Sequence, residues 1–177
     1  FNYWADILRI KSILARRTSG EPFIHWMKET LADNDPYDEW VAELLAANGP
    51  GHAEGNGATG LLLRDRNMPE DSMSNTVRVF LGTRLECAQC HDHPFDKWTR
   101  EDFYSVAAFF GKTRRRENNL TRTVYTTEDK ISSVMWPPED ESDPNDRKPM
   151  KANFPFPYLD ESEDLTFINR LEELRAA

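Results

Sequence analysis

The chain contains few residues of the types that usually carry catalytic or metal chemistry: two cysteines and four histidines among 177 residues. Two cysteines exclude the dense disulfide framework that stabilises many small secreted domains. The sequence also contains no nucleophile motif, no phosphate-binding glycine loop and no dinucleotide-binding fingerprint. The common hydrolase and nucleotide-binding classes are therefore not indicated.

Long apolar runs and net positive charge are lacking as well. No stretch approaches the ~20 apolar residues that a membrane-spanning helix requires, so we expect no membrane span in this chain. The formal net charge is −9, which argues against general binding to nucleic acid. Acid is concentrated in residues 139–143, whereas residues 112–116 are locally basic. We interpret both runs as solvated loops.

An initiating methionine and a signal peptide are also missing. The sequence opens at Phe1 directly in an amphipathic pattern and stops at Ala177 within a helix-like pattern. We interpret the chain as a piece of something longer.

Both cysteines lie in one short motif, Cys87-Ala88-Gln89-Cys90-His91. C-x-x-C-H is the attachment pattern of a c-type haem. Two thiols three residues apart lie on one side of a helical turn and can add to the two haem vinyl groups, while the imidazole that follows is placed beneath the iron. The motif predicts covalent haem c on Cys87 and Cys90 with His91 as axial ligand. Because this attachment occurs after export, it also predicts an extracytoplasmic location, periplasmic or secreted.

Three other interpretations of the motif stay open. Cys87, Cys90, His91 and His93 are all of zinc-ligand type, although four ligands within seven residues would be strained around a tetrahedral ion. A redox-active dithiol normally follows a strand and precedes a helix, whereas this motif follows a helical pattern. A disulfide would leave His91 unexplained.

The sixth position of the iron decides what such a haem can do. Methionine or histidine there suits electron transfer, and an open position allows small-ligand chemistry. Met73 is the first candidate if the chain turns near Gly82, because an unbroken helix would separate Met73 from His91 by ~27 Å. Met73 as an ordinary core residue is the competing interpretation. The other candidates are Met68, Met135, Met150, His25 and His52.

His93 is too close to His91 in sequence to reach the opposite face of the same haem. We expect it to hydrogen-bond a propionate or a backbone carbonyl, or simply to fix the turn that follows the motif. Four aromatic residues could cover the haem or form ordinary core: Phe95, Trp98, Phe103 and Phe110.

Apolar periodicity predicts a mainly α fold with a small two-stranded β element. Helices are expected over residues 1–17, from Pro22, from an Asp35 N-cap with Pro36 at N1, from Met68, and from a Thr99 cap. Strands are expected over residues 121–127 and 131–136. A proline-rich acidic arm (137–157) and a last helix capped by Asp160 would complete the chain. The predicted division is a helical haem-binding domain over 1–112 and an appended part over 113–177.

Four ordered strings resemble one family. They are YWADILRIKS (3–12), RDRNMPEDSMSNTVRVFLGTR (64–84), CAQCHDHPFDKW (87–98) and DFYSVAAFF (102–110). Together they resemble planctomycete cytochrome domain 2, a cytochrome-like domain of unknown function in large secreted proteins, over about residues 1–112. The resemblance implies a c-type haem domain that works beside adjoining domains or redox partner proteins.

The predicted function is therefore electron transfer by a monohaem c-type cytochrome domain within a larger secreted redox protein, more than a stand-alone enzyme. Two alternatives remain. One is a haem enzyme or gas-binding module with an open sixth position, and the other is a structural or interaction module.

Overall fold

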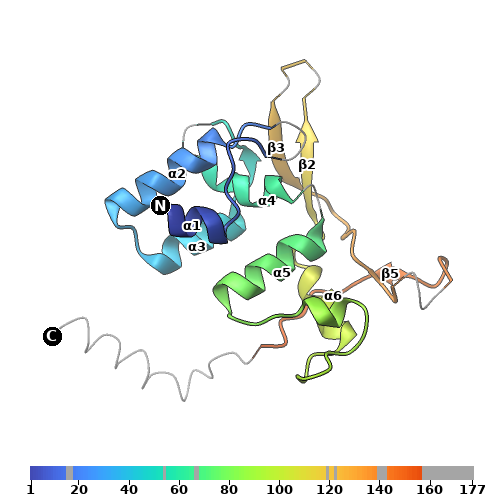
Figure 1. The fold of residues 1–177 in the computed structure, drawn as a ribbon. Coiled ribbons are helices and arrows are strands. Elements are labelled where there is room, and N and C mark those ends of the chain that lie inside the picture. The colour runs from blue at the N-terminus through green and yellow to red at the C-terminus, as the bar shows by residue number, and fades with distance from the viewer. Residues whose placement is uncertain are drawn as a thin grey trace, which may run out of the picture.

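The computed structural model describes residues 1–14, 18–53, 55–65, 68–118, 120–121, 123–138 and 143–156. Of these residues, 42% are helical and 12% lie in strands, which form two small sheets. The fold is therefore mixed α/β, and the mainly α prediction is wrong. Its error lies in the segment after residue 112, where the β structure is more extensive than two strands (Figure 1).

The first helices surround one core. They are α1 (Asn2–Ile7), α2 (Glu21–Asp33), α3 (Tyr37–Ala46), the 3₁₀-helix η2 (Gly57–Thr59) and α4 (Gly60–Arg64). The buried side chains of this N-terminal core are Leu8, Phe23, Trp26, Met27, Trp40, Leu44, Ala58 and Leu61. Gly60 permits the close approach of α4 to α2, because a Cβ atom there would lie 2.4 Å from Cβ of Phe23. Pro22 occupies the first turn of α2, as predicted.

The helix predicted over residues 1–17 is too long. The observed helix α1 ends at Ile7. Beyond it, Arg9 has a positive φ of 53°, and Ile13 forms a β-bridge with Ser19. Leu8 and Leu14 are nevertheless buried, so the apolar spacing reflects packing of an irregular segment. Residues 15–17 lie outside the described part. The third helix has Pro36, and not Asp35, at its N-cap.

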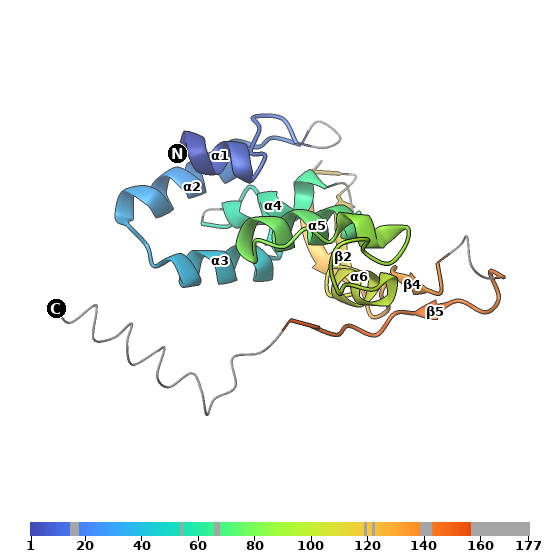
Figure 2. The same ribbon diagram turned by 60° about the horizontal axis from the view of Figure 1, so that its bottom comes forward.

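The second core lies under residues 87–91, which we call the Cys-His motif. It is built by α5 (Pro69–Phe80), the 3₁₀-helix η3 (Glu86–Gln89) and α6 (Arg100–Ala107). Buried residues of this C-terminal core include Met73, Val77, Leu85, Ala88, Trp98, Phe103, Val106 and Val134. Helix α5 joins the two cores, because its Val79 and Phe80 pack against the N-terminal core. Figures 1 and 2 show α5 between α1–α4 and α6.

A three-stranded antiparallel sheet has the order β1-β3-β2, from β1 (Gly49–Pro50), β2 (Thr113–Glu117) and β3 (Val124–Glu128). A second pair joins β4 (Met135–Trp136) to β5 (Lys148–Pro149). The predicted pairing of 121–127 with 131–136 is wrong, and so is the loop interpretation of 112–116. Asp129 pairs with both Arg114 (3.1 Å) and Arg116 (2.8 Å), which lets this basic segment form a strand.

The division of the chain into a helical domain over residues 1–112 and an appended part over 113–177 stays a prediction. Strand β1, from the first part, pairs with β3, from the second. The predicted last helix after Asp160 and most of the acidic run lie outside the described residues.

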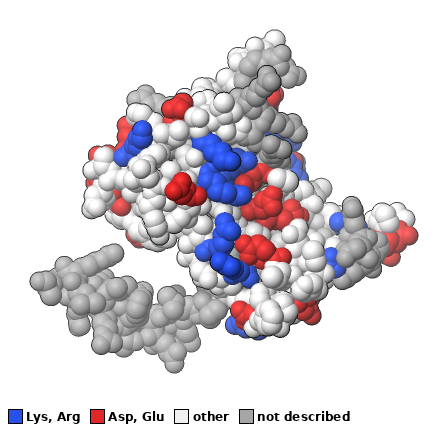
Figure 3. Space-filling model, in the orientation of Figure 1, with Lys and Arg blue, Asp and Glu red and all other residues white. Residues whose placement is uncertain are grey.

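None of the helices in the described residues has the length and apolar character that crossing a membrane demands. On the face shown in Figure 3, acidic and basic side chains are interspersed and form no extended area of one sign.

Candidate functional site

The Cys-His motif lies on a tight turn that is anchored from below. Helix α5 ends at Phe80, and Gly82 turns the chain with a φ of 64°, which glycine adopts without steric cost. The chain then returns over α5, where Leu85 and Ala88 are fully buried in the C-terminal core. The turn near Gly82 that the Met73 hypothesis requires is therefore present.

Ala88 points inward, and the two thiols on either side of it point outward. Cys87 and Cys90 are both free and exposed. Cys87 in η3 and Cys90 at its C-cap thus present two thiols to solvent, while Ala88 between them holds the turn in place. Both thiols are therefore accessible for covalent modification.

His91 has a defined tautomer. Its Nδ1 lies 2.7 Å from the carbonyl oxygen of Asp92. Because a carbonyl oxygen can only accept a hydrogen bond, Nδ1 carries the proton and donates it. In the neutral imidazole, Nε2 then keeps its lone pair and is available as a ligand. A backbone carbonyl in this position also orients the ring.

His93 has the opposite tautomer. The backbone N–H of Phe95 donates to His93 Nδ1 at 3.2 Å, so Nδ1 has no proton and the neutral ring carries it on Nε2. His93 is therefore a hydrogen-bond donor at Nε2, and its other nitrogen stabilises the turn to Phe95. His91 and His93 therefore expose different ring nitrogens, a lone pair on Nε2 of His91 and an N–H on Nε2 of His93.

The loop between the motif and α6 is tied together by its own polar groups. The N–H of His93 donates to the Trp98 carbonyl (2.8 Å), and Trp98 Nε1 donates to Asp96 (3.0 Å). Asp92 accepts from the N–H of Arg100 (2.8 Å), and Arg100 Nε donates to the Gln89 carbonyl (3.0 Å). These bonds fix the Cys-His turn relative to the start of α6.

An open hollow of about 530 Å³ lies beside the motif. It is lined by Cys90, His91, Asp92, Thr99, Arg100, Glu101 and Trp136. The donor set suits haem c, since it offers the Cys90 thiol, an imidazole with a free Nε2, and the cationic Arg100 for a carboxylate, while the Cys87 thiol is exposed outside the hollow's lining. Among the described lining residues, the large apolar side chain is that of Trp136, on one side of the hollow, so a haem held here would remain partly open to solvent.

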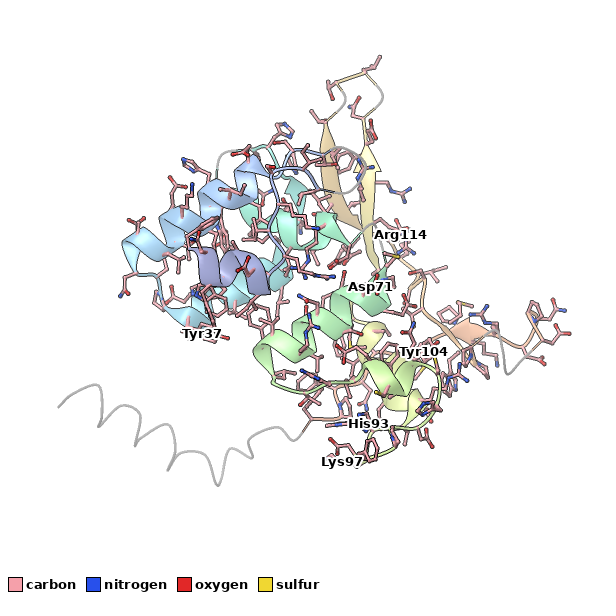
Figure 4. The ribbon with its side chains drawn as sticks, viewed as in Figure 1. Tyr37, Asp71, His93, Lys97, Tyr104 and Arg114 are labelled. Atoms are coloured by element: carbon pink, nitrogen blue, oxygen red, sulfur yellow. The ribbon has the colours of Figure 1, made fainter. Side chains whose placement is uncertain are left out.

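The other predicted residues have different surroundings. Met73 is 0% exposed and packs in the C-terminal core, which is also where Trp98 and Phe103 lie. Phe95 is 94% exposed and covers nothing in the described structure. His25 lies on the surface and pairs with Glu29 at 2.9 Å. Figure 4 shows His93 and Lys97 near the end of the molecule opposite the β2–β3 hairpin.

The described residues contain no group of three or more His, Cys, Asp and Glu side chains that could hold a metal ion. The zinc interpretation of Cys87, Cys90, His91 and His93 therefore gains no support. The sequence alone did not indicate Arg100, Glu101 or Trp136 as lining residues. Trp136 belongs to β4, and no local pattern could place it beside His91.

The start of α6 carries the predicted cap. Thr99 Oγ1 accepts from the Asp102 N–H (3.1 Å), and Asp102 accepts from the Thr99 N–H (2.9 Å), which together form a capping box. Replacing Thr99 by Ala should lower the free energy of unfolding by about 1 kcal/mol in urea titrations, because one N–H of the first turn loses its acceptor. Thr99→Ser is the control and should remain close to the wild type. Equal loss in both variants would contradict the role of the hydroxyl.

Residues 1–115 match the profile of the family PSCyt2, described as a protein of unknown function (DUF1549). The chain belongs to this family, and the resemblance to planctomycete cytochrome domain 2 is confirmed at that level. No curated protein and no solved structure matches the chain.

Proposed function

We propose that this domain carries one covalent haem c on Cys87 and Cys90, with His91 as axial ligand, and transfers electrons within a larger secreted redox protein. The observation that carries the proposal is the combination of two outward-facing thiols with an imidazole whose Nε2 is free to bind a metal. The proposed location is extracytoplasmic, and the proposed partners are adjoining domains or redox proteins.

Bound haem would supply one-electron redox chemistry. The chain's own contribution is to hold the thiols and the imidazole still. Ala88 anchors the turn from below, and the Asp92 carbonyl fixes the ring of His91. Arg100, at the wall of the hollow, would attract the carboxylate of a haem propionate. The open side of the hollow gives a redox partner a short route to the site.

The test is a haem stain after denaturing electrophoresis, together with a pyridine haemochrome assay, on protein produced with haem-attachment machinery. We expect about one covalent haem per chain, because the sequence holds one C-x-x-C-H motif. The double variant Cys87→Ser/Cys90→Ser should lose the stain completely. His93→Gln is the matched control and should keep it. Protein that matures without any covalent haem would refute the proposal.

A second candidate is a haem module with an open sixth position. Its support is the lining of the hollow, which includes neither a methionine nor a histidine other than His91 among the described residues. Addition of carbon monoxide to the reduced protein separates the candidates. A rapid shift of the Soret band indicates accessible iron, and an unchanged spectrum indicates that a sixth ligand closes it.

A further inference from the structure

A separate pocket of about 380 Å³ lies between the first helices and the β2–β3 hairpin. We call it the hairpin pocket. Its apolar floor is formed mainly by Leu14, Phe23, Leu63 and Val124. Its polar lining comes from Thr18, Ser19, His52, Thr59, Arg115, Glu117 and Thr123, and its glycines are Gly51, Gly57 and Gly60. It shares no lining residue with the hollow beside His91.

The walls of the hairpin pocket are held by specific bonds. Asn56 Nδ2 donates to the carbonyl oxygens of Asn48 and Pro50, both at 2.9 Å, and so closes the loop between β1 and η2. Thr59 Oγ1 donates to the Asn56 carbonyl at 2.8 Å. The pairing of Gly49 with Thr126 attaches this loop to the sheet. The pocket is therefore preformed, as ligand pockets usually are.

The basic run of β2 divides between two faces of the strand. Arg114 and Arg116 pair with Asp129, whereas Arg115 and Glu117, two residues apart, line the hairpin pocket. The Arg115 side chain is 5% exposed, donates to Thr18 Oγ1 at 3.2 Å and lies 3.6 Å from the Glu117 carboxylate. Figure 4 shows Arg114 on this strand. The pocket thus presents a buried guanidinium and a carboxylate side by side.

Among the described lining residues, the charges of Arg115 and Glu117 oppose and balance each other. A ligand with a net charge would upset this balance. The guanidinium offers donors, the carboxylate offers acceptors, and the hydroxyl groups offer both. Adjacent donors and acceptors over an apolar floor suit a molecule with hydroxyl groups on a carbon ring. The volume lies near the lower end of the usual range for ligand pockets, about 300–1,000 Å³.

We propose that the hairpin pocket binds a small uncharged polyhydroxylated molecule, the size of a single sugar or cyclitol ring. The Arg115–Glu117 pair would contact adjacent hydroxyl groups, and Phe23 and Leu63 would contact the carbon skeleton. This site is independent of the haem and does not rest on it.

The experiment is saturation-transfer NMR on the full chain at pH 7 with four probes: myo-inositol, D-galactose, D-galacturonate and D-galactosamine. Myo-inositol or galactose should receive saturation and give a measurable Kd. The anionic and cationic analogues should bind at least about tenfold more weakly, because each brings an unbalanced charge into a partly buried site. Absence of transfer to both neutral probes overturns the proposal, and so does preference for a charged analogue.

Glu117→Gln tests the pairing directly. The substitution keeps the volume but leaves the charge of Arg115 unbalanced, so affinity for the neutral probe should fall about tenfold and galacturonate should become the better ligand. Glu128→Gln, on an exposed position of the paired strand and outside the pocket, is the matched control and should change neither affinity. Thr123→Trp should block binding by filling the pocket, with far-UV circular dichroism checking the fold. Unchanged binding in Glu117→Gln would place the probe elsewhere and overturn the assignment.

Discussion

Replacement of Asp65 by Asn is expected to lower the free energy of unfolding by about 3–5 kcal/mol, since it removes one partner of a buried ion pair. The Asp65 side chain is 5% exposed. It accepts hydrogen bonds from Arg9 (2.8 Å), Arg64 (3.1 Å) and Ser72 (3.2 Å). Asp65 therefore links the segment after α1 to the end of α4 and the first turn of α5.

The size of the effect comes from Arg64, whose side chain is 4% exposed. Burial lowers the pKa of the Arg64 guanidinium, and the charge of Asp65 opposes this shift. One guanidinium nitrogen donates to the Leu8 carbonyl, but Nη2 is buried without a hydrogen-bond partner. With asparagine at position 65, the positive charge of Arg64 would be buried with little compensation.

Urea unfolding followed by circular dichroism measures this effect. Asp71→Asn is the matched control, because Asp71 is exposed in the first turn of α5, where its interaction with the helix dipole is worth less than about 1 kcal/mol. Equal losses of stability in Asp65→Asn and Asp71→Asn would show that the buried ion pair contributes nothing beyond a surface charge.

The helices that could be predicted are those whose signals are local. Pro22 and Pro69 in first turns and the Thr99 cap located α2, α5 and α6, because each of these signals acts within a few residues. The hairpin could not be predicted in the same way. Its first strand is a run of arginines, and what neutralises two of them is Asp129, which lies beyond the second strand.

The same distinction holds at the site. Cys87, Cys90 and His91 form a contiguous motif, so their proximity follows from the chain itself. The tautomer of His91 depends on one carbonyl contact, and the wall formed by Trp136 depends on the pairing of β4 with β5. Neither the contact between the adjacent residues His91 and Asp92 nor the pairing of β4 with β5 leaves a periodic pattern in the sequence. The wall formed by Trp136 also decides how open the hollow is, and therefore which chemistry a haem held there would support.

Met73 is the residue for which packing and ligation give opposite expectations. It is fully buried among the side chains of the C-terminal core, while His91 is exposed on the other side of the η3 turn from that core. As a core residue, Met73→Ala should lower the free energy of unfolding by about 2–5 kcal/mol because it leaves a cavity. Met73→Leu, which keeps the volume, should cost less than about 1.5 kcal/mol.

The leucine variant separates the two roles, because it preserves packing and removes the sulfur. We expect Met73→Leu to leave the visible spectrum and the response to carbon monoxide unchanged in haem-loaded protein. Met68→Leu is the matched control, since Met68 is 43% exposed at the start of α5. If Met73→Leu alone abolished the weak near-infrared band of methionine-ligated haem and made the iron reactive to carbon monoxide, Met73 would be the sixth ligand. The C-terminal core would then have to rearrange around the bound haem, since the thioether is enclosed in the structure described here.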